Sequence, residues 1–216
     1  MKKAKSILVF SVIAAFMILM TVIHYESKKM LDFSENLEET AVTVDGVNIT
    51  LAEMAFYVAY EENSVEEQAY IYSPDNTNAY WNLHIDGQFV KVAAKQAALD
   101  MAVHDVIFAA LAVEENVTLS AADIASVENT ESDFWQDLTG EQKQRLGVSE
   151  EQIYSTMEQL ALAQKYQAKL SEDTGLDYET YSIAGSNYEK ILEQHTVEVR
   201  KKIWSKIDFG NIVVQH

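Results

Sequence analysis

The sequence predicts a mainly α-helical bundle, closed by a small β-sheet from its two ends and preceded by a transmembrane signal anchor. Apolar residues make up 48% of its 216 residues, but only one proline and seven glycines are present. This composition disfavours all-β sandwiches and barrels, which need many tight turns. Several internal segments have helical hydrophobic spacing, whereas short segments near both ends alternate apolar and polar residues.

The first 29 residues have the pattern of a targeting segment. Three lysines precede residues 7–23, an uncharged and mainly apolar run of seventeen residues. A helix of this length spans roughly 25 Å, close to the thickness of a bilayer core. The following sequence "TVIHYESKKML" has no small-x-small cleavage site, and without cysteine there is no lipoprotein processing. We therefore predict an uncleaved signal anchor in the cell membrane, single-pass, with the N-terminus cytoplasmic.

The remainder should form a polar stalk over residues 30–40 and one extracytoplasmic domain over residues 41–216. From residue 30 onward, 33 Asp and Glu face 11 Lys and Arg, a net charge of −22. Such a surface repels phosphate backbones, which disfavours nucleic acid as a partner. The absence of cysteine excludes disulfides, thiolate metal sites and a cysteine nucleophile, and it suits a bacterial extracytoplasmic protein.

The domain should open with a hairpin followed by a helix. "AVTVDGVNIT" (residues 41–50) alternates around Asp45-Gly46, a typical two-residue hairpin turn. Thr50 then precedes Glu53 by three residues, the spacing of a capping box, so a helix should run from there to about Tyr72.

Four helical segments follow a connector, "AYWNLHIDG". A wide apolar face predicts a helix over 88–116, packed on several sides. A Ser120 cap predicts a second helix to about Leu138, and "TGEQKQRLG" predicts a short one. The capping box "SEEQ" (149–152) then opens a last long helix, which should end near "SEDTG".

The C-terminal segment should supply a partner for the opening strand. After a short helix within 178–195, "TVEV" alternates, "RKKIWSKI" suits a final helical turn, and "IDFGNIVVQ" is rich in β-branched residues. We predict that this tail pairs with the first strand and closes the domain like a clasp.

Three short motifs occur in a characteristic order: "VDGVNIT" (44–50), "AVEENVTLS" (112–120) and "GVSEE" (147–151). Over residues 41–172 the chain resembles the N-terminal chaperone region of SurA/PrsA-type extracytoplasmic foldases, which is also similar to the peptide-binding domain of trigger factor. The resemblance implies a SurA-N-like fold that binds unfolded or secreted polypeptides and needs no cofactor.

One part of that family's pattern is missing. Its full-length members carry a parvulin prolyl-isomerase domain, but only 44 residues follow residue 172 here, too few for such a domain. We therefore expect a chaperone without a catalytic site. Two alternatives stay open: a peptidyl-prolyl isomerase by family, and a structural or scaffolding subunit that forms a homodimer.

Histidines offer little catalytic or metal-binding signal. Asp100 and His104 are four residues apart on one helix face, and His84 lies two residues before Asp86. A zinc site needs three or four converging ligands, and neither pair has a third nearby. We expect ordinary hydrogen-bonded pairs or exposed groups, with no metal bound.

Aromatic and methionine side chains are the candidate peptide-binding groups. Amphipathic aromatic residues and flexible methionines suit a surface that accepts many apolar sequences, although they also suit core packing. The candidates are Phe56, Tyr57, Tyr60, Tyr80, Trp81, Phe134, Trp135 and Met157.

Overall fold

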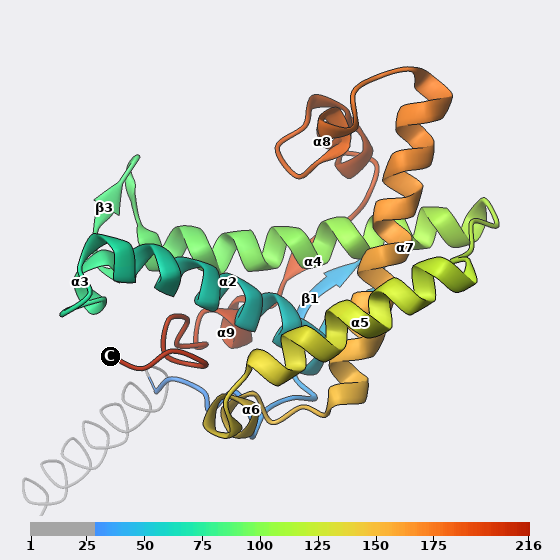
Figure 1. Ribbon diagram of the computed structural model, residues 1–216. Coiled ribbons are helices and arrows are strands. Elements are labelled where there is room, and N and C mark those ends of the chain that lie inside the picture. The colour runs from blue at the N-terminus through green and yellow to red at the C-terminus, as the bar shows by residue number, and fades with distance from the viewer. Residues whose placement is uncertain (1–28) are drawn as a thin grey trace, which may run out of the picture.

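The computed structural model describes residues 29–216, which form a helical bundle with a small antiparallel sheet on one side (Figure 1). The predicted membrane span over 7–23 lies outside the described residues. In chain order the elements are β1 (Thr40–Val44), β2 (Val47–Thr50), α2 (Leu51–Tyr72), α3 (Asn78–Trp81), β3 (His84–Ile85), β4 (Gln88–Phe89), α4 (Val90–Glu114), α5 (Ala121–Asp137), α6 (Gly140–Leu146), α7 (Glu150–Thr174), the 3-10 helix η1 (Tyr178–Tyr181), α8 (Ser186–Leu192), β5 (Val197–Val199) and α9 (Lys201–Trp204).

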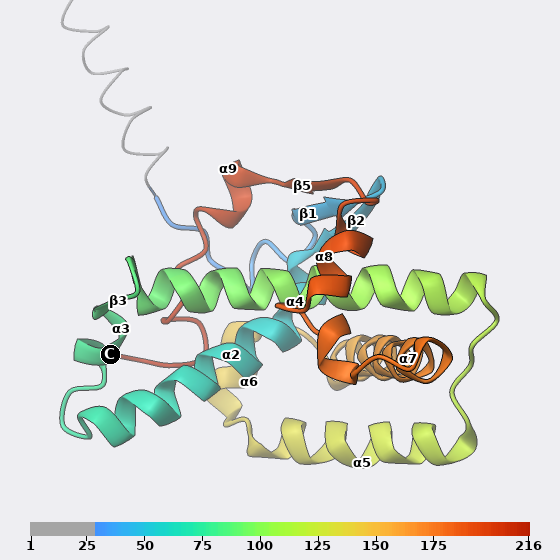
Figure 2. The same ribbon diagram turned by 90° about the horizontal axis from the view of Figure 1, so that it is seen from above.

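Helix α4 is the centre of the bundle. It packs against α2 and α7 on one side and against β1 on the other, and α5 packs on the outer side of α7. Figure 2 shows this layering, with β1, β5 and α9 on one side of α4 and α5 on the opposite side. By length and composition alone α4 could cross a membrane, but more than half of its apolar window is buried inside the bundle, as expected for a core helix.

The helix boundaries follow the capping residues of the sequence. The side chains of Thr50, Ser120 and Ser149 each accept a hydrogen bond from the backbone N–H three residues later. The side chain of that later residue accepts a hydrogen bond from the backbone N–H of the capping residue in return. Gly147 and Gly175 end α6 and α7 with positive φ angles of 69°, a conformation that suits glycine. These predicted helices are confirmed within one or two residues.

The sheet joins the two ends of the domain, in the order β2-β1-β5. Strand β1 pairs antiparallel with β2 across the Asp45-Gly46 turn, where both residues have positive φ. On its other edge β1 pairs with β5, so that Val42 faces Val199. The predicted clasp is therefore confirmed, with "TVEV" supplying the partner strand.

The last segment, residues 207–216, is not a strand, so the prediction that "IDFGNIVVQ" pairs in the sheet is wrong. Its backbone instead wraps around Glu62 of α2, a fully buried carboxylate. The N–H groups of Gly210, Ile212, Val213 and Val214 all donate to Glu62 at 2.6–3.3 Å. One buried acceptor thus satisfies the donors that a strand would have presented to a neighbour.

The predicted stalk also belongs to the folded domain. Phe33 is buried, and Leu31 forms a bridge to Ile207 and donates its N–H to the Lys206 carbonyl at 2.8 Å. A second hairpin, β3–β4, forms within the connector, where Asp86 and Gly87 have positive φ. Asp86-Gly87 is a typical two-residue hairpin turn, as Asp45-Gly46 is in the first hairpin.

Candidate functional site

Three adjoining cavities follow the side of the bundle where α2, α5 and α7 meet. The central cavity has a volume of about 440 Å³, a second beside it about 480 Å³, and a third about 950 Å³. The central and second cavities share Thr130, Met157, Leu160, Gln164 and Tyr178 as walls. The central and third cavities share Tyr60 and Phe134. We call these three cavities together the groove.

The central cavity is lined mainly by apolar and aromatic side chains. Helix α2 supplies Phe56, Tyr57 and Tyr60, α5 supplies Phe134, and α7 supplies Met157. The Phe56 ring lies 5.1 Å from that of Phe134 and 6.0 Å from that of Tyr60, measured between centroids. Tyr60 is 51% exposed and Phe134 is half-buried, whereas Phe56 and Tyr57 are buried, so the cavity is reached from outside at Tyr60 and Phe134. A cavity of this size and lining suits an apolar ligand.

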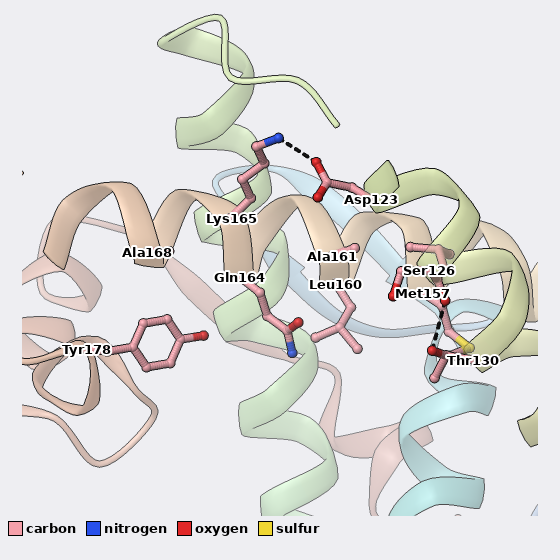
Figure 3. Close-up of a pocket in the computed structure, with 11 residues that line it drawn as sticks. Asp123, Ser126, Thr130, Met157, Leu160, Ala161, Gln164, Lys165, Ala168 and Tyr178 are labelled. Carbon is pink, nitrogen blue, oxygen red and sulfur yellow. Dashed lines mark hydrogen bonds and ion pairs between the residues drawn. The ribbon is translucent and has the colours of Figure 1, made fainter. Parts of the chain in front are cut away.

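The second cavity lies between α5 and α7. Figure 3 shows an ion pair between Lys165 and Asp123 at one end, and Gln164 between Leu160 and Tyr178 along the floor. The Lys165 ammonium lies 2.5 Å from the Asp123 carboxylate and, with the Ser120 N–H, lowers the pKa of Asp123 to about 2. The Gln164 side chain is exposed and has no hydrogen bond within the described part of the chain, so its amide is free to bond a ligand.

The third cavity is acidic. Its walls include Tyr70 and Ile71, which are 64% and 83% exposed, together with Glu66, Glu67 and Asp137. Within residues 29–216 no cation pairs with Glu67 or Asp137. This end of the groove therefore combines exposed apolar surface with unneutralised negative charge.

A buried polar cluster forms the base of the central cavity. Tyr57 donates its hydroxyl hydrogen to Asp105 at 3.0 Å, and His104 Nδ1 lies 2.9 Å from the other oxygen of Asp105. His104 Nε2 lies 3.1 Å from the Tyr181 carbonyl oxygen. Both ring nitrogens of His104 therefore have a partner inside the protein.

Burial dominates the electrostatics of this cluster. Asp105 is 3% exposed, and desolvation raises the pKa of its carboxyl even though His104 lowers it. The pKa of the Tyr57 hydroxyl is raised well above its usual range, first by burial and then by Asp105. Each Asp105 oxygen and each His104 ring nitrogen has one partner inside the protein, so the cluster links α2, α4 and η1.

The expected Asp100–His104 pair is wrong, since Asp100 accepts from Gln96 and His104 bonds the adjacent Asp105. His84 is exposed on β3 and packs edge-on against Phe89. Within residues 29–216 no group of three His, Cys, Asp or Glu side chains is placed to hold a metal ion.

Five of the eight predicted binding residues line the central cavity. The other three lie elsewhere: Tyr80 bonds Gln68, Trp81 is buried against Phe209, and Trp135 lies under the Lys143 ammonium. Met101, Leu160, Tyr178 and Ile183 also line the cavity and were not predicted from the sequence. The sequence around these residues does not distinguish a side chain that lines a cavity from one that packs in the core.

No protein-family profile, curated protein or solved structure matched this chain. The resemblance to SurA/PrsA-type foldases therefore stays a prediction.

Proposed function

We propose that this chain is a membrane-anchored, extracytoplasmic chaperone that holds apolar segments of unfolded, exported polypeptides in the groove. The observation that carries the proposal is the central cavity, where aromatic side chains of α2 and α5 and Met157 of α7 form an apolar lining that is reached from outside at Tyr60 and Phe134. Unfolded segments expose apolar side chains, and the burial of such side chains is the main source of favourable binding energy.

The neighbouring cavities supply what an extended segment needs beyond one apolar contact. Gln164 stands between the central and second cavities, where its free amide can bond a client's backbone. Glu67 and Asp137 line the third cavity, where they would attract a lysine or arginine beside the apolar residue of the client. The net charge of −22 beyond residue 29 favours the solubility of a loaded complex.

The full chain, reconstituted in lipid nanodiscs, tests the proposal with a fluorescent apolar peptide and anisotropy as the readout. The variant Phe134→Ala removes a ring shared by the central and third cavities, so we expect about tenfold weaker binding. The matched control is Phe89→Ala, because Phe89 is 46% exposed on β4 and lines no cavity of the groove. This control should bind within twofold of the wild type.

Three results would contradict the proposal. The first is that the wild type binds no measurable peptide. The second is that Phe134→Ala and Phe89→Ala weaken peptide binding equally. The third is a dimer in light scattering whose second copy fills the groove and excludes the peptide, which would favour a scaffolding subunit. Proline-dependent turnover of a peptide by the same preparation would instead favour an isomerase.

A further inference from the structure

The basic side chains of this acidic domain are distributed unevenly. Most of those in the bundle are already engaged: Arg145, Lys165 and Lys169 in ion pairs, and Lys95 and Lys143 over aromatic rings. By contrast, Arg200, Lys201 and Lys202 are consecutive and exposed at the start of α9. Within residues 29–216 none of these three side chains has a carboxylate partner.

Unpaired cations are unexpected where carboxylates outnumber them threefold, 33 to 11. Three acidic residues, Asp32, Glu198 and Asp208, flank this segment without pairing with it. With the exposed Lys29, Arg200–Lys202 make four basic side chains against these three acidic ones. We call Lys29 together with Arg200–Lys202 the basic face.

The basic face lies beside the point where the folded domain begins. The Leu31 N–H donates to the Lys206 carbonyl at 2.8 Å, and Leu31 bridges to Ile207. Only seven residues separate Leu31 from the end of the predicted span at Ile23, a distance of at most about 29 Å. If residues 7–23 anchor the chain, the basic face is held close to the bilayer surface.

We propose that the basic face docks on anionic lipid headgroups and so orients the domain on the membrane. The argument rests on the anchor in the proposed function, and on the charge and position of Arg200–Lys202. Each basic side chain near an anionic surface contributes about a fivefold gain in binding, so three give on the order of a hundredfold. The acidic remainder of the domain is repelled by the same surface.

Docking in this orientation has a consequence for the groove. Figure 2 places α9 and β5 on the opposite side of α4 from α5, whose residues line the groove. A domain that lies on its basic face therefore turns α5 and the groove away from the bilayer. Clients would reach the groove from the aqueous side.

The test uses the full chain in nanodiscs of zwitterionic lipid alone or with about one third anionic lipid. Lysine acetylation, quantified by mass spectrometry, reports the access to each ammonium group. We expect the reactivity of Lys201 and Lys202 to fall severalfold in anionic discs and to recover in about 0.5 M salt, because salt screens the attraction. Lys165, which faces α5, is the internal control and should react equally in both discs.

A variant makes the test specific. In Arg200→Gln/Lys201→Gln/Lys202→Gln, the reactivity of the exposed Lys29 should depend less on the lipid than it does in the wild type. Equal labelling of Lys201 and Lys202 in both discs would overturn the inference. Peptide binding, measured on the same discs, tests the function of the groove independently of docking. If the chain did not co-purify with lipid, both the anchor and the docking would be overturned.

Discussion

The ion pair at the base of the central cavity makes a quantitative prediction. In the variant His104→Leu the Asp105 carboxylate, 3% exposed, keeps only the Tyr57 hydroxyl as a partner. Removing one member of a buried ion pair costs about 3–5 kcal/mol, because the remaining charge is desolvated without compensation. For a chain of this size such a loss lowers Tm by roughly 10 °C.

The double variant His104→Leu/Asp105→Leu separates this explanation from simple loss of packing. It removes both charges and leaves the Tyr57 hydroxyl unpaired, at a cost of about 1–3 kcal/mol, whereas the Tyr181 carbonyl loses its bond to His104 in both variants alike. We therefore expect the double variant to be more stable than His104→Leu alone, by at least about 1 kcal/mol. Urea unfolding of the full chain in detergent, followed by tryptophan fluorescence, measures both. If the two losses add as for independent sites, the ion-pair account is refuted.

Two further predictions concern the C-terminal tail. Burial raises the pKa of Glu62 to about 7 from its ordinary 4.5, so the folded state binds more protons between these values. The free energy of unfolding should therefore fall by up to about 3 kcal/mol as pH rises from 4.5 to 7, and Glu62→Gln should remove that part of the pH dependence; parallel pH profiles of the two proteins would contradict it. Gly210 has a φ of 90°, and a Cβ there would lie 2.9 Å from the Trp81 ring, whereas Gly175 has a φ of 69° and open space around it. In urea unfolding, Gly210→Ala should thus lose about 1–3 kcal/mol more stability than Gly175→Ala, and equal losses would show that the tail does not pack on Trp81.

The predictable part of the fold was encoded locally. Capping boxes such as Thr50–Glu53 placed the helices, because the bonds they form lie within one turn. The Asp45-Gly46 turn predicted the first hairpin, and the alternation of "TVEV" is typical of a strand, since period and turn chemistry are local as well. Each of these signals can be read from fewer than ten neighbouring residues.

The tail could not be predicted in the same way. Its β-branched residues favour a strand, but the outcome depends on Glu62, about 150 positions earlier in the chain. Nothing in the sequence around Glu62 distinguishes it from Glu61 beside it, which is only half-buried. Tertiary contact with one buried acceptor overrides the local preference.

The candidate site was likewise predicted only in part. Residue type identified Phe56, Tyr60 and Phe134, because aromatic groups suit binding surfaces. The same criterion selected Trp81 and Trp135, which pack elsewhere. Which aromatic side chains share a cavity depends on how α2, α5 and α7 cross, and spacing within one helix does not carry that information.

Site-specific photocrosslinking tests the central claim, that the groove holds unfolded polypeptides, most directly. A photoreactive phenylalanine analogue at Tyr60, which is 51% exposed in the central cavity, would be compared with the same analogue at Phe89. Each full-length protein is illuminated in nanodiscs with a chemically unfolded client of known sequence, and the linked client peptides are identified by mass spectrometry. We expect crosslinks from position 60 to apolar client segments, and few from position 89. Equal crosslinking from both positions, or none from position 60, would contradict the proposed function.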